Sequence, residues 1–156
     1  MAGENQNTNV GIEQGGDVLF IKSGGKAVFE SGAILEIQDG AITTGNKVYI
    51  GGEIIDVSTA ASHWTLSPVA GTITKIWSVI DGTTATADAV LTFELGGTLV
   101  TGGTVTIADA SSAGDVDSAT PTAANVVTAG QAIECITDGG STNTVKSKLI
   151  FEITQS

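Results

Sequence analysis

The sequence contains few of the side chains that usually carry out catalysis. Its 156 residues include one His, one Cys and no Arg. Enzyme active sites commonly combine a nucleophile, a general base and a group that stabilises developing charge. Because the usual residues for these roles are missing or occur once, we expect a protein that is not an enzyme. We also expect no catalytic residue, no cofactor and no bound metal ion.

Basic residues are scarce relative to acidic ones. Seventeen Asp and Glu residues accompany six Lys residues, which gives a formal net charge of -11 at pH 7. Nucleic-acid binding depends on clustered basic side chains that displace counterions, and anionic membrane surfaces also attract basic segments. We therefore expect no nucleic acid and no membrane as a partner.

With a single cysteine, Cys135, the chain can form no disulfide within itself. Cys135 alternates with Ile133 in a strand-like segment, which is typical of a buried structural thiol. The amino-terminal residues are polar and lack the apolar segment of a signal peptide, and no apolar run approaches the length of a membrane span. We therefore expect a soluble protein made in a reducing cytoplasm.

The abundant residue types favour strands and turns. Hydrophobic residues make up 41% of the chain, aromatics only 4%, and there are 21 Gly. Residues 54–156 contain segments with a period of two, separated by Gly-rich turns such as Gly96-Gly97, which predicts an all-β, antiparallel β-sandwich or jelly-roll-like domain. The expected strands are Ile54–Thr59, Trp64–Ser67, Thr72–Ile80, Ala89–Leu95, Thr104–Ala108, Asn125–Thr128, Gln131–Thr137 and Thr144–Thr154.

Alternation also predicts which side chains enter the core. Leu91, Phe93 and Leu95 are expected to share one face of their strand. In the last strand, the residues expected to face inward are Val145, Leu149, Phe151 and Ile153, and those expected to face water are Lys146, Lys148 and Glu152.

The N-terminal third differs from this domain. Residues 1–16 are polar and predict a flexible arm. Residues 17–53 contain short apolar pieces between Gly turns, and Ser31–Ile34 is echoed by Asp39–Ile42. Strands this short gain a core only by packing on neighbours. Either three copies wind together in a homotrimer, or the region forms a β-meander on the rest of its own chain.

Three features could form sites, and each has an ordinary explanation. His63 has no ligand or catalytic partner nearby in sequence and is typical of a surface or strand-end residue.

Asp109, Asp115 and Asp117 lie in a connection expected to be unstructured from Ala108 to about Asn125. They could ligate Ca²⁺, although the EF-hand spacing is absent. A solvated acidic loop is the alternative.

The two tryptophans could bind sugars by stacking. Trp77 lies in the middle of a predicted strand and is expected in the core, whereas Trp64 is expected to be more exposed. One Tyr and two Trp are a small set for a sugar-binding platform.

Several segments resemble small structural proteins of tailed bacteriophages. They are Pro68–Gly82 (PVAGTITKIWSVIDG), Gly102–Ala108 (GGTVTIA), Ala113–Asn125 (AGDVDSATPTAAN) and, in the N-terminal third, Gly25–Ile37 (GKAVFESGAILEI). The similarity is to capsid decoration (cement) and head-fibre proteins. It lies in the pattern of strands and turns and includes no catalytic signature.

This resemblance implies a homotrimer on the outside of a phage head, made in the host cytoplasm, that binds the major capsid protein and stabilises the shell. An extended N-terminal arm could dock by pairing with an exposed strand edge. The apolar residues expected to contact the capsid are Val10, Ile12, Val18 and Phe20. The alternative is a carbohydrate- or receptor-binding β-sandwich on a virion surface.

Overall fold

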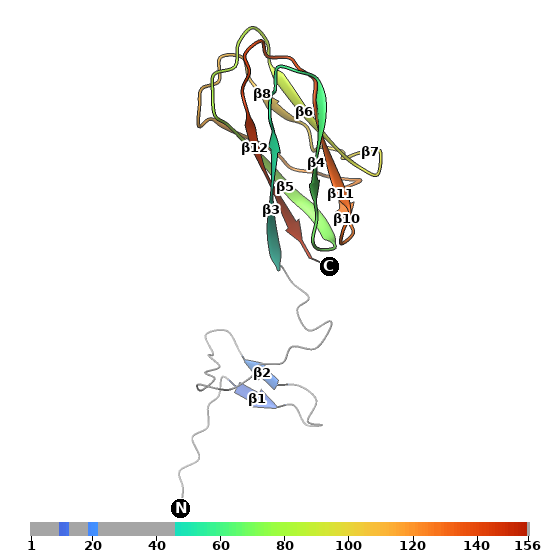
Figure 1. The fold of residues 1–156 in the computed structure, drawn as a ribbon. Coiled ribbons are helices and arrows are strands. Elements are labelled where there is room, and N and C mark those ends of the chain that lie inside the picture. Colours follow the sequence, from blue (N-terminus) through green and yellow to red (C-terminus); the bar gives the residue numbers. More distant parts are fainter. Residues whose placement is uncertain (1–9, 13–18, 22–45, 156) are drawn as a thin grey trace, which may run out of the picture. The chain divides into compact units, whose positions relative to one another are not determined.

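The computed structural model describes residues 10–12, 19–21 and 46–155 (Figure 1). The chain divides into two compact units, Met1–Ala41 and Ile42–Ser156. The described residues form strands, turns and loops without a helix, so this part of the chain has no helix that could cross a membrane. The prediction of an all-β fold is confirmed.

The first unit contains two short described strands. β1 (Val10–Ile12) and β2 (Leu19–Ile21) pair antiparallel, with Gly11 opposite Phe20. β1 falls within the predicted arm, so residues 10–12 pair with a strand of their own chain. The remaining predictions for residues 1–45, including the repeat at residues 31–42, lie outside the described residues.

The second unit is a sandwich of two antiparallel sheets. In the first, which we call the β12 sheet, the order is β10-β5-β12-β3, and β9 also pairs with β5. Its strands are β3 (Lys47–Ile54), β5 (Gly71–Ile80), β9 (Val116–Ala119), β10 (Val126–Val127) and β12 (Ser147–Thr154).

The second sheet, which we call the β11 sheet, has the order β4-β11-β6-β7, and β8 also pairs with β6. Its strands are β4 (Ala61–Leu66), β6 (Ala89–Leu95), β7 (Thr98–Leu99), β8 (Val105–Ile107) and β11 (Ala132–Thr137). The turn between β6 and β7 is Gly96-Gly97, with φ values of 59° and 78°. Two successive positive φ values suit a tight hairpin and favour Gly at both positions.

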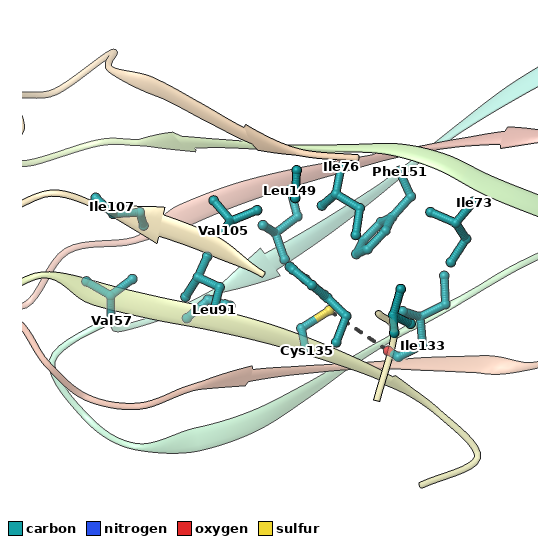
Figure 2. Close-up of a cluster of buried hydrophobic side chains, with 14 of the residues drawn as sticks. Val57, Ile73, Ile76, Leu91, Val105, Ile107, Ile133, Cys135, Leu149 and Phe151 are labelled. Atoms are coloured by element: carbon teal, nitrogen blue, oxygen red, sulfur yellow. Dashed lines mark hydrogen bonds between the residues drawn. The ribbon is translucent and has the colours of Figure 1, made fainter. Parts of the chain in front are cut away.

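The core lies between the two sheets and consists mainly of aliphatic side chains (Figure 2). Phe93 of β6 and Phe151 of β12 meet at its centre, edge to face, with ring centroids 5.4 Å apart. The predicted inward set of β12, with Val145 just before it, is buried, as is the predicted face of β6. Strand alternation therefore identified the inward faces of β6 and β12 correctly.

Several predicted boundaries differ from the structure. β4 begins at Ala61 instead of Trp64, and β12 begins at Ser147 instead of Thr144. The strand expected at Ile54–Thr59 is wrong, because β3 ends at Ile54 and a turn follows. The Asp56 carboxylate accepts hydrogen bonds from the backbone N–H of Ser58 (2.8 Å) and from the hydroxyls of Ser58 and Thr59, which stabilises that turn. Residues 47–53, assigned from sequence to the N-terminal region, pair with β12 and belong to the sandwich (Figure 1).

The connection from Ala108 to Asn125, expected to be unstructured, contains β9. Val116–Ala119 pair with Val79–Ile76 of β5. The segment was missed because it is short and has polar residues, Asp117 and Ser118, between its apolar ends. Pairing with a long neighbouring strand supplies the order that the segment's own pattern does not predict.

Candidate interaction surface

The outer face of the β12 sheet carries a cluster of apolar side chains that do not enter the core. Alternation along β3, β5 and β12 sends one set of residues inward and the other outward. In the outward set, Trp77 lies opposite Ile150, and Ile150 lies opposite Gly51. The next row contains Val116 of β9 opposite Val79 of β5.

We call this cluster the β12-face patch and define it as Tyr49, Trp77, Val79, Val116 and Ile150. Tyr49 is 58% exposed and Val116 62% exposed, while Trp77 and Val79 are half-buried. Together with Ser78 and Lys148 they line a shallow depression of about 440 Å³, whose surface is almost entirely apolar. Trp77 was expected in the core, but its side chain lies on the outer face.

The two aromatic rings of the patch lie side by side. The centroids of Tyr49 and Trp77 are 6.5 Å apart, with their planes tilted by 38°. This separation is within the range of favourable aromatic pairs. A partially exposed Trp beside an exposed Tyr gives a broad surface that loses little conformational entropy when it is covered.

Glu152 fixes one side of the patch. Its carboxylate accepts hydrogen bonds from the Thr74 hydroxyl (2.7 Å), the Lys47 ammonium (2.9 Å) and the Tyr49 hydroxyl (3.0 Å). These bonds, led by that from Thr74, lower the pKa of Glu152, and the same carboxylate raises the pKa values of Lys47 and Tyr49. Tyr49 is thereby held in position over the sheet.

The expectation that Glu152 faces water is wrong, since the residue is only 8% exposed. Its side chain does lie on the outer face, opposite Tyr49. The register between β12 and β5 shifts after Glu152, so that Ile153 lies opposite Ile73 and Thr74 has no directly opposite residue. This bulge brings the Thr74 hydroxyl to the carboxylate, and a bulge of this kind is not visible in the alternation of β12.

Lysines surround the β12-face patch. Lys47, Lys75 and Lys148 lie in the outward rows of β3, β5 and β12. Lys47 pairs with Glu152, Lys148 forms an ion pair with Glu53, and Lys75 donates to the Thr120 hydroxyl at 3.3 Å. In a chain with a net charge of -11, this face therefore carries three cationic groups and only two carboxylates.

The outer face of the β11 sheet has the opposite charge. One row across its strands reads Trp64 (β4), Glu134 (β11), Glu94 (β6) and Leu99 (β7), each opposite the next. Trp64 is 65% exposed, and Leu66 lies two residues further along β4, also exposed. The strands of this sheet contain no Lys. Among the described residues, neither glutamate has a side-chain hydrogen bond or an ion pair.

The residues predicted from sequence to contact a capsid belong to the first unit. Val10 and Ile12 are in β1 and Phe20 is in β2, so the two strands that carry them are paired. Val18 lies outside the described residues. Contact between these residues and a shell stays a prediction.

Cys135 is buried, as predicted. The fold places His63 of β4 directly opposite it, although 71 residues separate the two in the sequence. Burial, with a smaller effect of the Glu134 charge, raises the pKa of Cys135 to about 12. The thiol is therefore protonated at neutral pH and is a poor nucleophile, even with an imidazole nearby.

Local hydrogen bonds order the acidic connection between residues 108 and 125. The Asp115 carboxylate accepts from the backbone N–H of Ser112 at 2.7 Å, which closes a turn. Asp117 lies in β9 opposite Ser78, and burial and the nearby Asp115 charge raise its pKa. Within residues 10–12, 19–21 and 46–155, no three His, Cys, Asp or Glu side chains are grouped so that they could hold a metal ion.

No protein-family model matches the chain, and no curated protein matches it. Among solved structures, the chain is similar to a chain of the cyanophage Pam1 capsid asymmetric unit, with 16% sequence identity and a TM-score of 0.40. The match covers 81% of this chain and 98% of the other. Similarity at this level establishes neither a shared fold nor a shared function.

Proposed function

We propose that the chain is a structural virion protein that binds the outside of a phage head as a homotrimer and stabilises the shell. Its partners are the major capsid protein and two further copies of itself, and it performs no catalysis. The observation that carries the proposal is the β12-face patch, an exposed apolar surface framed by lysines on a sandwich whose core is already complete. The sequence resemblance of residues 54–156 to decoration and head-fibre proteins supports the same conclusion.

Physical properties of the surface suit a structural role. Exposed apolar patches rimmed by polar groups commonly mark protein contacts. The depression is shallow and almost free of polar lining atoms, so it fits an apolar side chain of another protein better than a hydrophilic substrate. A homotrimer on a repeating shell would multiply modest individual contacts by avidity.

The proposal is tested by binding to heads assembled from the major capsid protein alone. The full chain should co-sediment with the heads and raise the temperature at which they break open. Deletion of residues 1–16, the predicted docking arm, should abolish co-sedimentation and leave the circular dichroism of the sandwich unchanged. If the truncated chain binds equally well, the arm is not the docking element. If the full chain does not bind, the proposed function is wrong.

A carbohydrate- or receptor-binding module remains the second candidate, because Trp64 is exposed beside Glu134 on the β11 sheet. An exposed Trp can stack on a sugar ring, and a neighbouring carboxylate can accept hydrogen bonds from its hydroxyls. This function requires that glycans quench Trp fluorescence and that Trp64→Ala removes the response.

A further inference from the structure

The two outer faces of the sandwich differ from each other in a complementary way. Both expose aromatic and aliphatic side chains, with Tyr49 and Ile150 on the β12 sheet and Trp64 and Leu66 on the β11 sheet. The charged residues around these side chains are three lysines and two glutamates on the β12 sheet. On the strands of the β11 sheet they are glutamates alone.

The acidic face places two like charges at opposite positions of neighbouring strands. Glu94 and Glu134 lie directly opposite each other on adjacent strands. Like charges at directly opposite positions destabilise a sheet. Within the described part of the chain no cation relieves this pair, and apolar Trp64 and Leu99 flank it. A partner that brings positive charge and apolar surface to this row would remove the repulsion and cover the apolar groups.

The lysine-rich face has matching features. Lys75 and Lys148 lie on either side of the row that contains Trp77 and Ile150. The ammonium of Lys75 has only a 3.3 Å bond to the Thr120 hydroxyl, and that of Lys148 is held by an exposed ion pair with Glu53. Exposed ion pairs of this kind contribute little free energy and exchange partners readily.

We infer that the outer face of the β12 sheet in one copy binds the outer face of the β11 sheet in a second copy, with Lys75 and Lys148 facing Glu94 and Glu134. Trp77 and Ile150 then pack against Trp64 and Leu66. This contact is head-to-tail, since it joins two different surfaces of the same chain. Repetition of such a contact gives a closed ring when the rotation between copies closes and an open array when it does not.

Charge decides between this arrangement and the symmetric ones. Two β11 faces in contact would bring four carboxylates together without a cation. Two β12 faces in contact would bring six lysines and four carboxylates together, and would leave Glu94 and Glu134 of both copies without a cation. Only the contact between unlike faces places cations against the uncompensated carboxylates. The inference rests on the proposed homotrimer only for the number of copies, because the complementarity is present whether or not the protein binds a phage head.

Charge reversal on the full chain tests the inference. Lys75→Glu with Lys148→Glu, and separately Glu94→Lys with Glu134→Lys, should each weaken self-association by about tenfold or more. The solution mass, measured by light scattering over a range of concentrations, gives the readout. Asp109→Lys, in a turn outside both sheets, is the charge control and should leave the mass unchanged.

The decisive variant carries all four substitutions in one chain. It restores the net charge of the natural chain and exchanges the signs of the two faces, so self-association should return. An equimolar mixture of the two double variants should also associate, because each supplies the face that the other lacks. The inference is overturned if the natural chain has the mass of one copy, if the double variants keep the natural mass, or if the quadruple variant is folded and does not associate.

Cross-linking of the unmodified chain keeps the test independent of how the variants fold. A carbodiimide joins ammonium and carboxylate groups that are in contact, and a mixture of light and heavy isotope-labelled copies separates links between copies from links within one. Links from Lys75 or Lys148 to Glu94 or Glu134 should join light to heavy chains. Links from Lys148 to Glu53 and from Lys47 to Glu152 serve as internal controls. Control links without any link between copies would overturn the inference.

The head-binding measurement separates this inference from the proposed function. If the chain binds heads but has the mass of one copy, the head-to-tail contact is wrong and the function stands. If it self-associates through the two faces but does not bind heads, the contact stands and the function is wrong.

Discussion

At the scale of single residues, Glu152 determines how the β12 face is built. Three donors converge on its carboxylate, from Thr74 in β5 and from Lys47 and Tyr49 in β3. β12 lies between those two strands, so this one side chain connects three strands of the sheet. The same bonds set the orientation of Tyr49, the most exposed ring of the β12-face patch. Glu152, which strand alternation predicts to face solvent, thus supports the candidate interface.

Glu152→Gln should lower the free energy of unfolding at pH 7 by about 1 kcal/mol, since an amide is a weaker acceptor than a carboxylate for these three donors. The folded-state pKa of Glu152 is lowered. Its stabilising contribution is therefore fully present above the pKa of the unfolded chain, about 4.3 for Glu, and is lost as the pH falls through the folded-state value. Urea unfolding at pH 7 and at pH 3 measures both effects.

The difference between the natural chain and Glu152→Gln should be smaller at pH 3 than at pH 7. Thr74→Val, which removes the hydroxyl and keeps the shape of the side chain, should reproduce part of the loss at pH 7. A difference that is the same at both pH values would show that the effect does not come from the ionised carboxylate.

At the scale of strands, two glycines of the β12 sheet have contrasting surroundings. A Cβ on Gly51 of β3 would have the carbonyl oxygen of Leu149 as its nearest neighbour, at 3.9 Å. A Cβ on Gly71 of β5 would collide with the carbonyl oxygen of Thr154 and come within 2.8 Å of Ile153 Cγ2. Close approach of neighbouring backbone therefore requires glycine at the start of β5 but not in the middle of β3.

Gly71→Ala should destabilise the sandwich by about 1–3 kcal/mol because backbone atoms of β12 must move. Gly51→Ala should leave stability unchanged or raise it by up to about 1 kcal/mol, since alanine loses less conformational entropy than glycine in a strand. Thermal unfolding of the two variants side by side makes the comparison. Equal effects of both substitutions would contradict the packing described for β5.

Strand positions could be predicted where burial alternates regularly. β6 was predicted to the residue, and β5 and β11 to within one residue at their starts. β9 could not be found, because its order comes from pairing with β5 across 35 intervening residues. The β12-face patch was also missed, since a period of two identifies two faces without saying what covers the outer one. Trp77 shows this limit, as it alternates correctly and lies on the outside.

At the scale of the whole molecule, the sandwich has one continuous core that both sheets share. Cys135 lies within it, near Ile133 (Figure 2), and its position in β11 is opposite that of Phe93 in β6. A group at this depth becomes accessible only when the sheets separate. The rate at which the Cys135 thiol reacts therefore measures the opening of the domain.

A thiol reagent added in excess at neutral pH should modify Cys135 no faster than the sandwich unfolds, because the group is buried and its pKa is about 12. In urea above the unfolding midpoint the same reagent should react at once. The rate of colour release from an aromatic disulfide reagent, compared with the unfolding rate from Trp fluorescence, provides the measurement. Fast modification of the native protein would show that the sheets open locally around β11.

The pairing of β3 with β12 has a consequence for how the sandwich responds to force. Lys47 lies opposite Thr154, and the backbone N–H of Gln155 donates to the carbonyl of Asn46 at 3.0 Å. The first and last described residues of the domain therefore lie side by side at one end of the β3–β12 pair. A force that separates residues 46 and 155 would break the hydrogen bonds between β3 and β12 one after another, starting at that end. A pull directed along the strands, from this end toward the loops at the far end, would load the whole ladder at once. The domain is therefore weak against peeling at one end and strong against stretching along its length.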